Sequence, residues 1–483
     1  MTENVLSFLL FSLLHLDVIA KSQPPNILLI LADDLGHADL DWHDSRLHTP
    51  NLRALAFSQS SVYLKGSYVN QLCTPTRSAL MTGYYPFRTG TQRGVFLNME
   101  ASGVPMDYSF LPQNLKKLGY QNYLIGKWHL GYCRREFLPT ARGFDYFYGY
   151  YGPQEGYFNH STDLYDRNTR KVVGGLDFFR EVNGRMHPIV NKNGVYSTHL
   201  FNDEAIRVLE THPRNQPFFL FLSYQAVHAP LQVPSSYQKF CTAFAHDYRR
   251  MIYCAMLAAM DESIGKVVRK LEKLGLLNNT LIAFSSDNGG DTTFGASNFP
   301  YRGEKNTLFE GGTKTVTFFH FKKEFSTFRN YTDLFHVVDW HPTLLGVAGG
   351  SALLYENGLH KRPFKGDGIN QWPAITQTGT RRLRRTQFIY NIDSPASAIR
   401  RGDYKLIYES SDVLHNAGRA RLFNLKLDPN ETNDIARKNP KLVAELLNRL
   451  RRFATKSRQS VRTPMDPRGN PIHFGGVFNG NWC

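Results

Sequence analysis

Residues 26–36 read Asn26-Ile-Leu-Leu-Ile-Leu-Ala32-Asp33-Asp34-Leu35-Gly36, and this stretch decides the fold class of the chain. Its apolar run does not alternate with polar residues, which is typical of a strand that is buried on both faces of a sheet. Two carboxylates follow the run directly. The stretch therefore predicts a strand inside a covered sheet, with polar side chains at its carboxyl end.

Two later stretches repeat this design. Pro217-Phe-Phe-Leu-Phe-Leu-Ser223 leads to Gln225-Ala-Val-His228, and Thr280-Leu-Ile-Ala-Phe-Ser-Ser286 leads to Asp287-Asn288-Gly289-Gly290. The apolar spacing from Met251 to Leu274 predicts a long helix between them. Buried strands that alternate with helices predict an α/β fold, with a large, mostly parallel or mixed sheet flanked by helices. Ligands of such sheets bind beyond the carboxyl ends of the strands, so we expect the functional site at that edge.

The pattern changes beyond about Thr378. Short segments of alternating polarity and one helix with apolar spacing predict a small antiparallel sheet plus a helix. The segments are 387–392, 398–400, 404–408 and 421–425, and the helix lies near 440–453. We therefore expect a signal peptide at 1–20, a main domain at 24–378 and a small C-terminal antiparallel-sheet subdomain at 379–483.

The N-terminus and the glycosylation triplets indicate the secretory pathway, with a lysosomal or extracellular destination. The apolar stretch from Val5 to Leu16 is short for a membrane span and is typical of a signal peptide, with a buried first helix as the alternative. No later apolar run is long enough to predict a transmembrane span. Asn-x-Ser/Thr triplets, the acceptors of N-glycosylation, begin at Asn159, Asn278, Asn330 and Asn430.

Five cysteines fit an oxidising compartment if four of them pair. They are Cys73, Cys133, Cys241, Cys254 and Cys483, and their spacing matches no metal-binding motif. If Cys73 is reserved for chemistry, the others allow three pairings. Among these pairings, a Cys241–Cys254 bridge closes the shortest loop and is the one that we favour.

The formal net charge of +16 favours anionic partners, such as sulfated glycans, nucleic acid or anionic membranes. The chain carries no zinc-finger spacing and no aromatic RNA-binding motif, so we expect no nucleic-acid partner. Four arginines form one dense basic run, which we expect to be a solvated surface. They are Arg381, Arg382, Arg384 and Arg385.

Hard oxygen ligands follow two of the predicted strands. They are Asp33, Asp34, Asp287 and Asn288. Carboxylate and amide oxygens suit Ca²⁺ or Mg²⁺, whereas zinc prefers nitrogen and sulfur. Either acidic pair alone could be a helix cap or a loop turn, but two pairs at one sheet edge predict a metal site.

Gly126-Lys127-Trp128-His129 places a cation two residues from an imidazole. On an extended segment both side chains would face the same way. A lysine that fixes an oxyanion beside a histidine that transfers protons suits an anionic substrate. His228 and Lys305 offer the same chemistry, although each in isolation is more often structural.

The most specific motif is Cys73-Thr74-Pro75-Thr76-Arg77, in which Pro75 restrains the loop and Arg77 can hold an oxygen or a substrate anion. A lone cysteine is more often a packing residue. Followed by residues 78–83, however, this motif resembles the C-x-P-x-R signature of sulfatases. Other stretches resemble sulfatase motifs in the same order along the chain: Asp33-Asp34, 119–129, 286–290 and 302–312. Residues 138–144 and 227–234 resemble the arylsulfatase B, I and J group in particular.

This resemblance implies an alkaline-phosphatase-like fold for the catalytic domain and a formylglycine made from Cys73 by the formylglycine-generating enzyme of the endoplasmic reticulum. Its hydrated aldehyde would bind one metal ion, Ca²⁺ rather than Mg²⁺, and attack the sulfur of a sulfate ester. The ligands carried over by position are Asp33, Asp34, Asp287 and Asn288, together with the modified Cys73.

The resemblance also implies roles for the basic residues. Sulfate and the leaving alcohol would be bound by Lys127, His228 and Lys305, with His228 or Lys305 as the proton donor. His129 would take a proton from the second hydroxyl, so that the aldehyde reforms and sulfate leaves. Arg77 would orient the hydrate.

The implied substrate is a sulfated glycosaminoglycan sugar such as N-acetylgalactosamine 4-sulfate. Aryl or steroid sulfates stay open, because the sequence does not name the ester. Two alternatives remain: a phosphoester or phosphonate hydrolase of the same superfamily, and an inactive secreted glycan-binding protein. Cysteine at the nucleophile position and the complete set of catalytic residue types favour the sulfatase.

Overall fold

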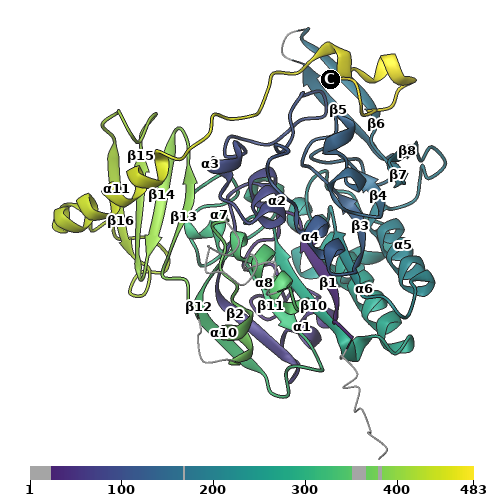
Figure 1. The fold of residues 1–483 in the computed structure, drawn as a ribbon, viewed down its shortest axis with the longest axis horizontal. Helices are drawn as coiled ribbons and strands as arrows, with labels where there is room; N and C mark the ends of the chain where they lie inside the picture. The colour runs from purple at the N-terminus through teal and green to yellow at the C-terminus, as the bar shows by residue number, and fades with distance from the viewer. Residues whose placement is uncertain (1–22, 167–168, 351–365, 379–382) are drawn as a thin grey trace, which may run out of the picture.

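The apolar run after Pro25 forms the predicted strand, β1 (Asn26–Ala32), and all of its residues are buried. The computed structural model describes residues 23–166, 169–350, 366–378 and 383–483. Within these residues, a ten-stranded mixed sheet forms the centre of the main domain (Figure 1). Across the sheet its strands are β12 (Arg329–His336), β2 (Ser61–Tyr68), β11 (Phe318–His320), β10 (Thr280–Ser286), β1, β9 (Phe218–Ser223), β3 (Gln121–Lys127), β4 (Tyr146–Tyr150), β7 (Phe179–Val182) and β8 (Arg185–Pro188).

Five adjacent strands of this sheet are parallel: β10, β1, β9, β3 and β4. Their carboxyl ends therefore lie at one edge. Strand β2 points the same way, because β11 is antiparallel both to β2 and to β10. The three predicted buried strands are thus neighbours at the centre of the sheet, and the α/β prediction is confirmed.

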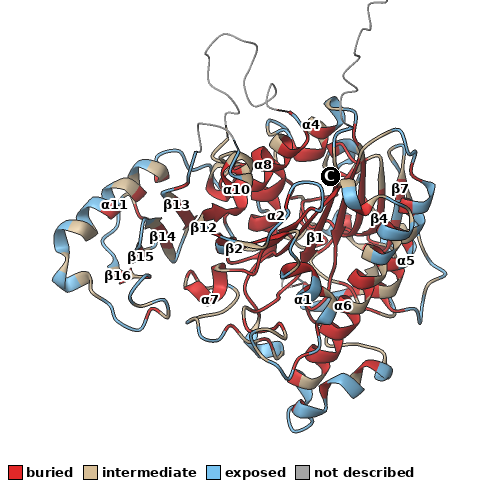
Figure 2. Ribbon diagram, turned by 90° about the horizontal axis from the view of Figure 1, so that it is seen from below, coloured by how far each residue is buried: buried red, intermediate tan, exposed pale blue. Residues whose placement is uncertain are grey.

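Helices cover both faces of the sheet, since successive side chains of each buried strand point into two different cores. Figure 2 shows these buried layers on either side of the strands. The helices on one face are α2 (Cys73–Thr82), α4 (Leu111–Lys117), α8 (Trp340–Val347) and α10 (Trp372–Thr376). Those on the other face are α1 (Pro50–Ala56), α5 (Ser197–Thr211) and α6 (Tyr248–Lys273). Helix α6 is the helix predicted between Met251 and Leu274.

A four-stranded antiparallel sheet lies beside the main domain and carries one helix, as predicted (Figure 1). Its strands are β13 (Gln387–Ile392), β14 (Ala396–Arg401), β15 (Tyr404–Glu409) and β16 (Arg419–Asn424), and the helix is α11 (Pro440–Ala454). Helix α11 buries Leu446, Leu450 and Ala454, which are spaced at about one helical turn. A small hairpin, β5 (Ser161–Asp166) and β6 (Lys171–Leu176), forms a separate sheet.

The basic run near residue 384 differs from the expected solvated surface. Arg384 is exposed and pairs with Asp333, but Arg385 is buried and pairs with Asp339. The expectation was wrong for Arg385, because a buried carboxylate compensates its charge. Arg381 and Arg382 lie outside the described residues, as does the predicted signal peptide. No helix in the described part of the chain is long and apolar enough to cross a membrane.

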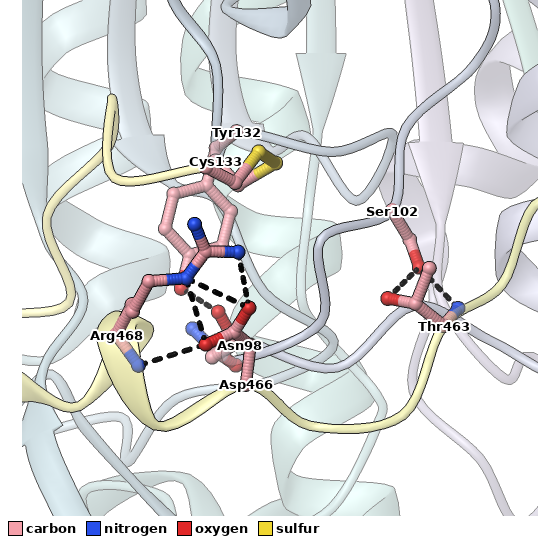
Figure 3. Close-up of a disulfide and its surroundings, with 8 residues drawn as sticks. Asn98, Ser102, Tyr132, Cys133, Thr463, Asp466 and Arg468 are labelled. Atoms are coloured by element: carbon pink, nitrogen blue, oxygen red, sulfur yellow. Dashed lines mark hydrogen bonds and ion pairs between the residues drawn. A yellow bond between two sulfur atoms is a disulfide. The ribbon is translucent and has the colours of Figure 1, made fainter.

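The segment after α11 runs back across the main domain and ends in a disulfide between Cys483 and Cys133 (Figures 1 and 3). On the way, the amide of Thr463 donates to Ser102 Oγ at 2.9 Å, and the amide of Asp466 donates to the carbonyl of Met99 at 2.8 Å. The second disulfide joins Cys241 to Cys254, which confirms the favoured pairing, and Cys73 is left as a buried free thiol.

Candidate active site

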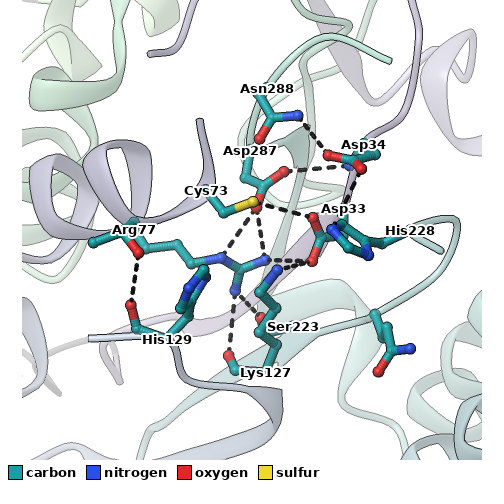
Figure 4. A network of polar contacts seen from close by, with 12 residues as sticks. Asp33, Asp34, Cys73, Arg77, Lys127, His129, Ser223, His228, Asp287 and Asn288 are labelled. Atoms are coloured by element: carbon teal, nitrogen blue, oxygen red, sulfur yellow. Dashed lines mark hydrogen bonds and ion pairs between the residues drawn. The ribbon is translucent and has the colours of Figure 1, made fainter. Parts of the chain in front are cut away.

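Polar side chains gather where the central parallel strands end (Figure 4). Asp33 and Asp34 follow β1, Asp287 and Asn288 follow β10, and Lys127 is the last residue of β3. Cys73 and Arg77 lie on the first turns of α2, while His129, His228 and Lys305 lie in loops at the same edge. The structure therefore brings together all ten residues that the sequence predicts for the site.

Arg77 is the centre of this arrangement. Its guanidinium is buried and donates to Asp287 Oδ2 through Nε at 3.0 Å and through Nη2 at 2.8 Å. Nη1 donates to Ser223 Oγ at 2.6 Å and to the carbonyl of Lys127 at 3.2 Å. A planar guanidinium held from several sides has one orientation, so it fixes the strand ends relative to the start of α2.

The Cys73 thiol lies within this group, and its Sγ donates to Asp33 Oδ1 over 3.6 Å. Burial raises the pKa of this thiol well above its usual range, although the ammonium of Lys127 opposes the shift. A cysteine that acts as a nucleophile needs the opposite environment, one that stabilises the thiolate. Cys73 in its reduced form is therefore a neutral thiol.

Lys127 and Lys305 each pair with one of the two carboxylates that follow β1. Lys127 Nζ lies 2.5 Å from Asp33 Oδ2, and Lys305 Nζ lies 2.6 Å from Asp34 Oδ2. Burial disfavours the charged form of Asp34, but Lys305 and His228 outweigh it and lower the pKa of Asp34 to about 2. The carboxyl group of Asp34 is therefore ionised at any physiological pH.

His129 differs from the extended geometry expected for it. Strand β3 ends at Lys127, and His129 has a φ of 62°, which lies in the left-handed region. The prediction of an extended segment was wrong, because the chain turns after the strand end. The ring Nε2 of His129 lies 3.0 Å from the carbonyl of Phe96, and its Nδ1 has no hydrogen-bond partner among the described residues. Burial, together with Lys127 and Arg77, lowers the pKa of His129 well below its usual range.

His228 faces Asp34 across 3.5 Å through Nε2, and its Nδ1 lies 2.6 Å from the carbonyl of Ala229. That carbonyl can only accept, so Nδ1 carries the proton in the neutral ring. Burial and the nearby ammonium of Lys305 lower the pKa of His228 to about 4. Tyr157 donates to the backbone carbonyl of His228 at 2.8 Å and helps to hold this loop.

The side chains fit a hard metal ion. Ligand atoms of Asp33, Asp34, Cys73 and His228 all lie within 4.8 Å of one another. Asn288 adds an amide oxygen, Oδ1, that is buried without a hydrogen-bond partner in the part of the chain that the structure describes, while its Nδ2 donates to Asp34 Oδ1 at 2.7 Å. A buried orphan acceptor beside carboxylates is what an oxygen-seeking cation would satisfy. The thiol of Cys73 is the exception, because sulfur is a soft ligand.

Ser223 is a contact that the sequence analysis did not single out. It is the last residue of β9 and accepts a hydrogen bond from Arg77. The signal was present, since a buried hydroxyl at the end of an apolar strand needs a partner. Gln225 was likewise not chosen, although its side chain donates to the carbonyl of Glu155 at 2.6 Å and so braces the segment before His228.

Comparisons with known proteins bear on the family of the chain. The profile of the family described as Sulfatase matches residues 25–351. Arylsulfatase J of Mus musculus is 34% identical over 96% of this chain and 81% of its own length. N-acetylgalactosamine-6-sulfatase of Mus musculus is 33% identical over 71% of this chain and 66% of its own.

The crystal structure of Ps i-CgsB in complex with k-i-k-neocarrahexaose superposes with a TM-score of 0.76 at 29% identity, covering 91% of this chain and 94% of that one. The fold, the order of the motifs and the family match all lead to one assignment. The chain belongs to the sulfatase family of sulfuric ester hydrolases.

Proposed function

We propose that this sulfatase uses calcium and a formylglycine made from Cys73, and acts on sulfated glycosaminoglycan sugars such as N-acetylgalactosamine 4-sulfate. One observation carries the proposal: the Cys73 thiol is buried and donates to the Asp33 carboxylate, and burial outweighs the nearby ammonium of Lys127, so that the thiol stays neutral. A neutral thiol is a poor nucleophile, and its sulfur is a poor ligand for a hard metal ion. An oxygen in its place removes both obstacles.

A hydrated formylglycine supplies an oxygen nucleophile and a second hydroxyl, and a bound Ca²⁺ supplies the positive charge that acidifies hydroxyls and neutralises sulfate. The residues that would hold the ion are Asp33, Asp34, Asp287 and Asn288. Arg77 lies one turn beyond residue 73 on α2, with its guanidinium fixed by Asp287 and Ser223. It would therefore orient the side chain of residue 73.

His129 would act as the base that removes the proton from the second hydroxyl. Because the carbonyl of Phe96 can only accept, the proton of the neutral ring resides on Nε2, and Nδ1 keeps a free lone pair. The lowered pKa of His129 keeps the ring neutral at neutral pH. A neutral ring with an unprotonated nitrogen can accept a proton, as a general base must.

Lys127, Lys305 and His228 would bind the sulfate oxygens and the leaving alcohol. Between the two candidate proton donors, the protonation states favour Lys305. Its pKa is raised because the attraction of Asp34 outweighs burial, so it stays charged. The pKa of His228, in contrast, is lowered to about 4, and a neutral imidazole has no proton on the ring nitrogen that faces Asp34.

The substrate class rests on the relatives and on charge. The curated relatives include an N-acetylgalactosamine-6-sulfatase, and Ps i-CgsB was crystallised with a neocarrahexaose. A net charge of +16 suits a polyanionic glycan, because it raises the local concentration of such a substrate.

We also propose maturation in the secretory pathway, with delivery to the lysosome or the extracellular space. The two disulfides support an oxidising compartment. Asn159, Asn278 and Asn330 are exposed, as N-glycosylation requires. The formylglycine-generating enzyme of that pathway would be a transient partner that acts on Cys73.

Sulfate release by the protein secreted from a host that makes formylglycine tests the proposal. Three substrates are compared: N-acetylgalactosamine 4-sulfate, N-acetylgalactosamine 6-sulfate and an aryl sulfate, with an aryl phosphate as the control. We expect wild type to release sulfate and Cys73→Ala to lose at least about a thousandfold in kcat/KM, since the covalent step is removed. Cys73→Ser tests whether a plain hydroxyl can replace the hydrate.

Each outcome separates the candidate functions. Equal rates for wild type and Cys73→Ala would overturn the proposed mechanism. Faster release of phosphate than of sulfate would favour the phosphoester hydrolase, and glycan binding without hydrolysis would favour the binding protein. A preference for the 6-sulfate would correct the proposed substrate while leaving the chemistry intact.

A further inference from the structure

The loop that carries Lys305 is fastened at both of its ends to one residue of the C-terminal region. At its start, Arg302 Nη1 donates to the backbone carbonyl of Glu431 at 3.0 Å. At its end, the amide of Glu310 donates to Glu431 Oε2 at 2.6 Å. Glu431 follows β16 and is fully buried, with a left-handed φ of 56°. A glutamate is retained in that conformation only where its surroundings fix it.

A single ammonium holds the two carboxylates of this junction. Lys405 of β15 is fully buried and lies 3.0 Å from Glu310 Oε1 and 2.9 Å from Glu431 Oε1. Tyr68 and Tyr390 donate to the two oxygens of Glu310 at 2.7 Å and 2.9 Å. Glu310 opens the short helix α7 (Glu310–Thr313), which faces the C-terminal sheet in both views of the fold (Figures 1 and 2).

Backbone hydrogen bonds connect this junction to the edge of the sheet where the candidate active site lies. The amide of Gly311 donates to the carbonyl of Arg302 at 2.7 Å, so the two fastened ends also close the loop. Within the loop, the amide of Lys305 donates to Gly290 at 3.2 Å, and that of Asn306 donates to Gln71 at 2.8 Å. The side chain of Lys305 therefore extends from a backbone that is held on both sides.

We propose that Lys405 and Glu431 are positioning residues for Lys305, through which the small C-terminal sheet takes part in the reaction. The inference rests on the proposed role of Lys305 toward the sulfate and the leaving alcohol. Removing the shared ammonium leaves two buried carboxylates side by side, and like charges so close repel. Glu310 and Glu431 would then separate, and the ends of the loop would move with them.

A double-mutant cycle in the full-length enzyme tests this inference, with Lys405→Met measured in wild type and in Lys305→Ala. We expect kcat/KM for an aryl sulfate to fall about tenfold to a hundredfold in the wild-type background, because displacement of a catalytic group by about 1 Å has effects of that size. In Lys305→Ala the same change should cost no more than about twofold, since the group being positioned is absent. In Lys405→Met, as in Lys305→Ala, kcat/KM should fall further for aryl sulfates with poorer leaving groups.

Two further variants keep the test decisive. Glu431→Gln retains an oxygen for the amide of Glu310 and is the milder change. It should lower kcat/KM in the wild-type background by less than Lys405→Met does, and it should have little effect in Lys305→Ala. Leu406→Ala is the matched control, because Leu406 is buried next to Lys405 on β15 and successive side chains of a strand point to opposite faces. It should lower Tm while leaving kcat/KM within about twofold of wild type.

The inference is overturned if Lys405→Met lowers kcat/KM by the same factor in wild type and in Lys305→Ala. It is also overturned if Leu406→Ala, at the same decrease in Tm, lowers kcat/KM as much as Lys405→Met does. Either would mean that Lys405 only stabilises the fold. Absence of sulfate release from wild type itself would instead overturn the proposed function, so the two failures are distinguishable.

Discussion

Residue 73 is embedded in charges that suit an oxygen nucleophile better than a sulfur one. The thiol is buried, faces Asp33, and lies among groups that also satisfy a hard cation. Three buried carboxylates lie together: Arg77 donates to both Asp33 and Asp287, and Asn288 donates to Asp34. Arg77, Lys127 and Lys305 already pair with these carboxylates. Binding of the proposed metal ion to the folded site would be linked to stability.

Chelation should therefore lower the thermal stability of the protein. We expect EDTA to decrease Tm and Ca²⁺ to restore it, with a gain of about 2.7 kcal/mol when Ca²⁺ is a hundredfold above its Kd. Differential scanning calorimetry across a Ca²⁺ titration measures the effect. Asp34→Asn should respond less, whereas Asp261→Asn, which alters a buried carboxylate bound to the start of α1, should keep the full response. A Tm that is indifferent to both EDTA and Ca²⁺ would contradict the metal site.

The sequence predicts the identities of the site residues better than their contacts. Asp33 and Asp287 could be placed together because each follows an apolar run, and parallel strands end at one edge. The left-handed turn at His129 and the hydrogen bond from Arg77 to Ser223 depend on how loops pack against one another. The local pattern of apolar residues does not predict how these loops pack.

At the scale of elements, helix α2 presents Cys73 to the site and is buried along its whole length. Its C-terminal turn is fixed by α8, because His341 Nδ1 lies 2.8 Å from the carbonyl of Met81. On the other ring nitrogen, His341 Nε2 lies 3.1 Å from Asn114 Nδ2 of α4. Since the carbonyl can only accept, Nδ1 carries the proton and Nε2 accepts, which requires a neutral ring.

This neutral histidine should make the fold sensitive to acid. Burial lowers the pKa of His341 from 6.5 to about 4. Its contribution to stability is complete above pH 6.5, and it is lost as pH falls toward 4, because the unfolded chain then binds a proton that the folded chain excludes. The difference is about 3 kcal/mol at most.

His341→Gln keeps a donor and an acceptor but does not titrate, so its Tm should fall less steeply than that of wild type between pH 6.5 and pH 4.5. Parallel Tm curves for the two proteins over this range would show that His341 is not the cause. His336, which burial also keeps neutral, is common to both proteins and cancels in the comparison.

The elements that the sequence predicts well are those with a clear pattern. Strands β1, β9 and β10 are continuous apolar runs, so their existence follows from periodicity. Alternating polarity predicts the strands of the small sheet, but the central residues of β13, β14 and β15 are buried in succession. The order of the strands in the sheet does not follow from periodicity. The place of β2 between β12 and β11 depends on side chains far apart in the chain, as does the burial of Arg385 against Asp339.

At the scale of the whole molecule, the chain folds back so that Cys483 lies beside the loop that follows His129. The disulfide joins Cys483 to Cys133, four residues after His129, and spans a sequence separation of 350. The backbone carbonyl of Cys133 also accepts from the amide of Trp482 at 2.8 Å. The last segment therefore restrains the loop that follows Lys127 and His129, a connection that no sequence motif indicates.

Loss of this disulfide should cost more than loss of the other one. The double variant Cys133→Ser/Cys483→Ser removes a cross-link over 350 residues, whereas Cys241→Ser/Cys254→Ser removes one over 13. Because loop-closure entropy grows with loop length, we expect losses of about 5 kcal/mol and about 3 kcal/mol in the free energy of unfolding. Urea denaturation of both variants measures them. A larger loss for the short loop would contradict the proposed restraint.

The conversion of Cys73 is the central claim, and the most direct measurement is mass spectrometry of the peptide that contains it. The protein is purified from a secretory host that makes formylglycine, digested, and treated with an aminooxy reagent that labels aldehydes. We predict that the wild-type peptide carries the label at residue 73 and that the peptide from Cys73→Ala does not. A peptide recovered as an unmodified, alkylatable thiol would contradict the account.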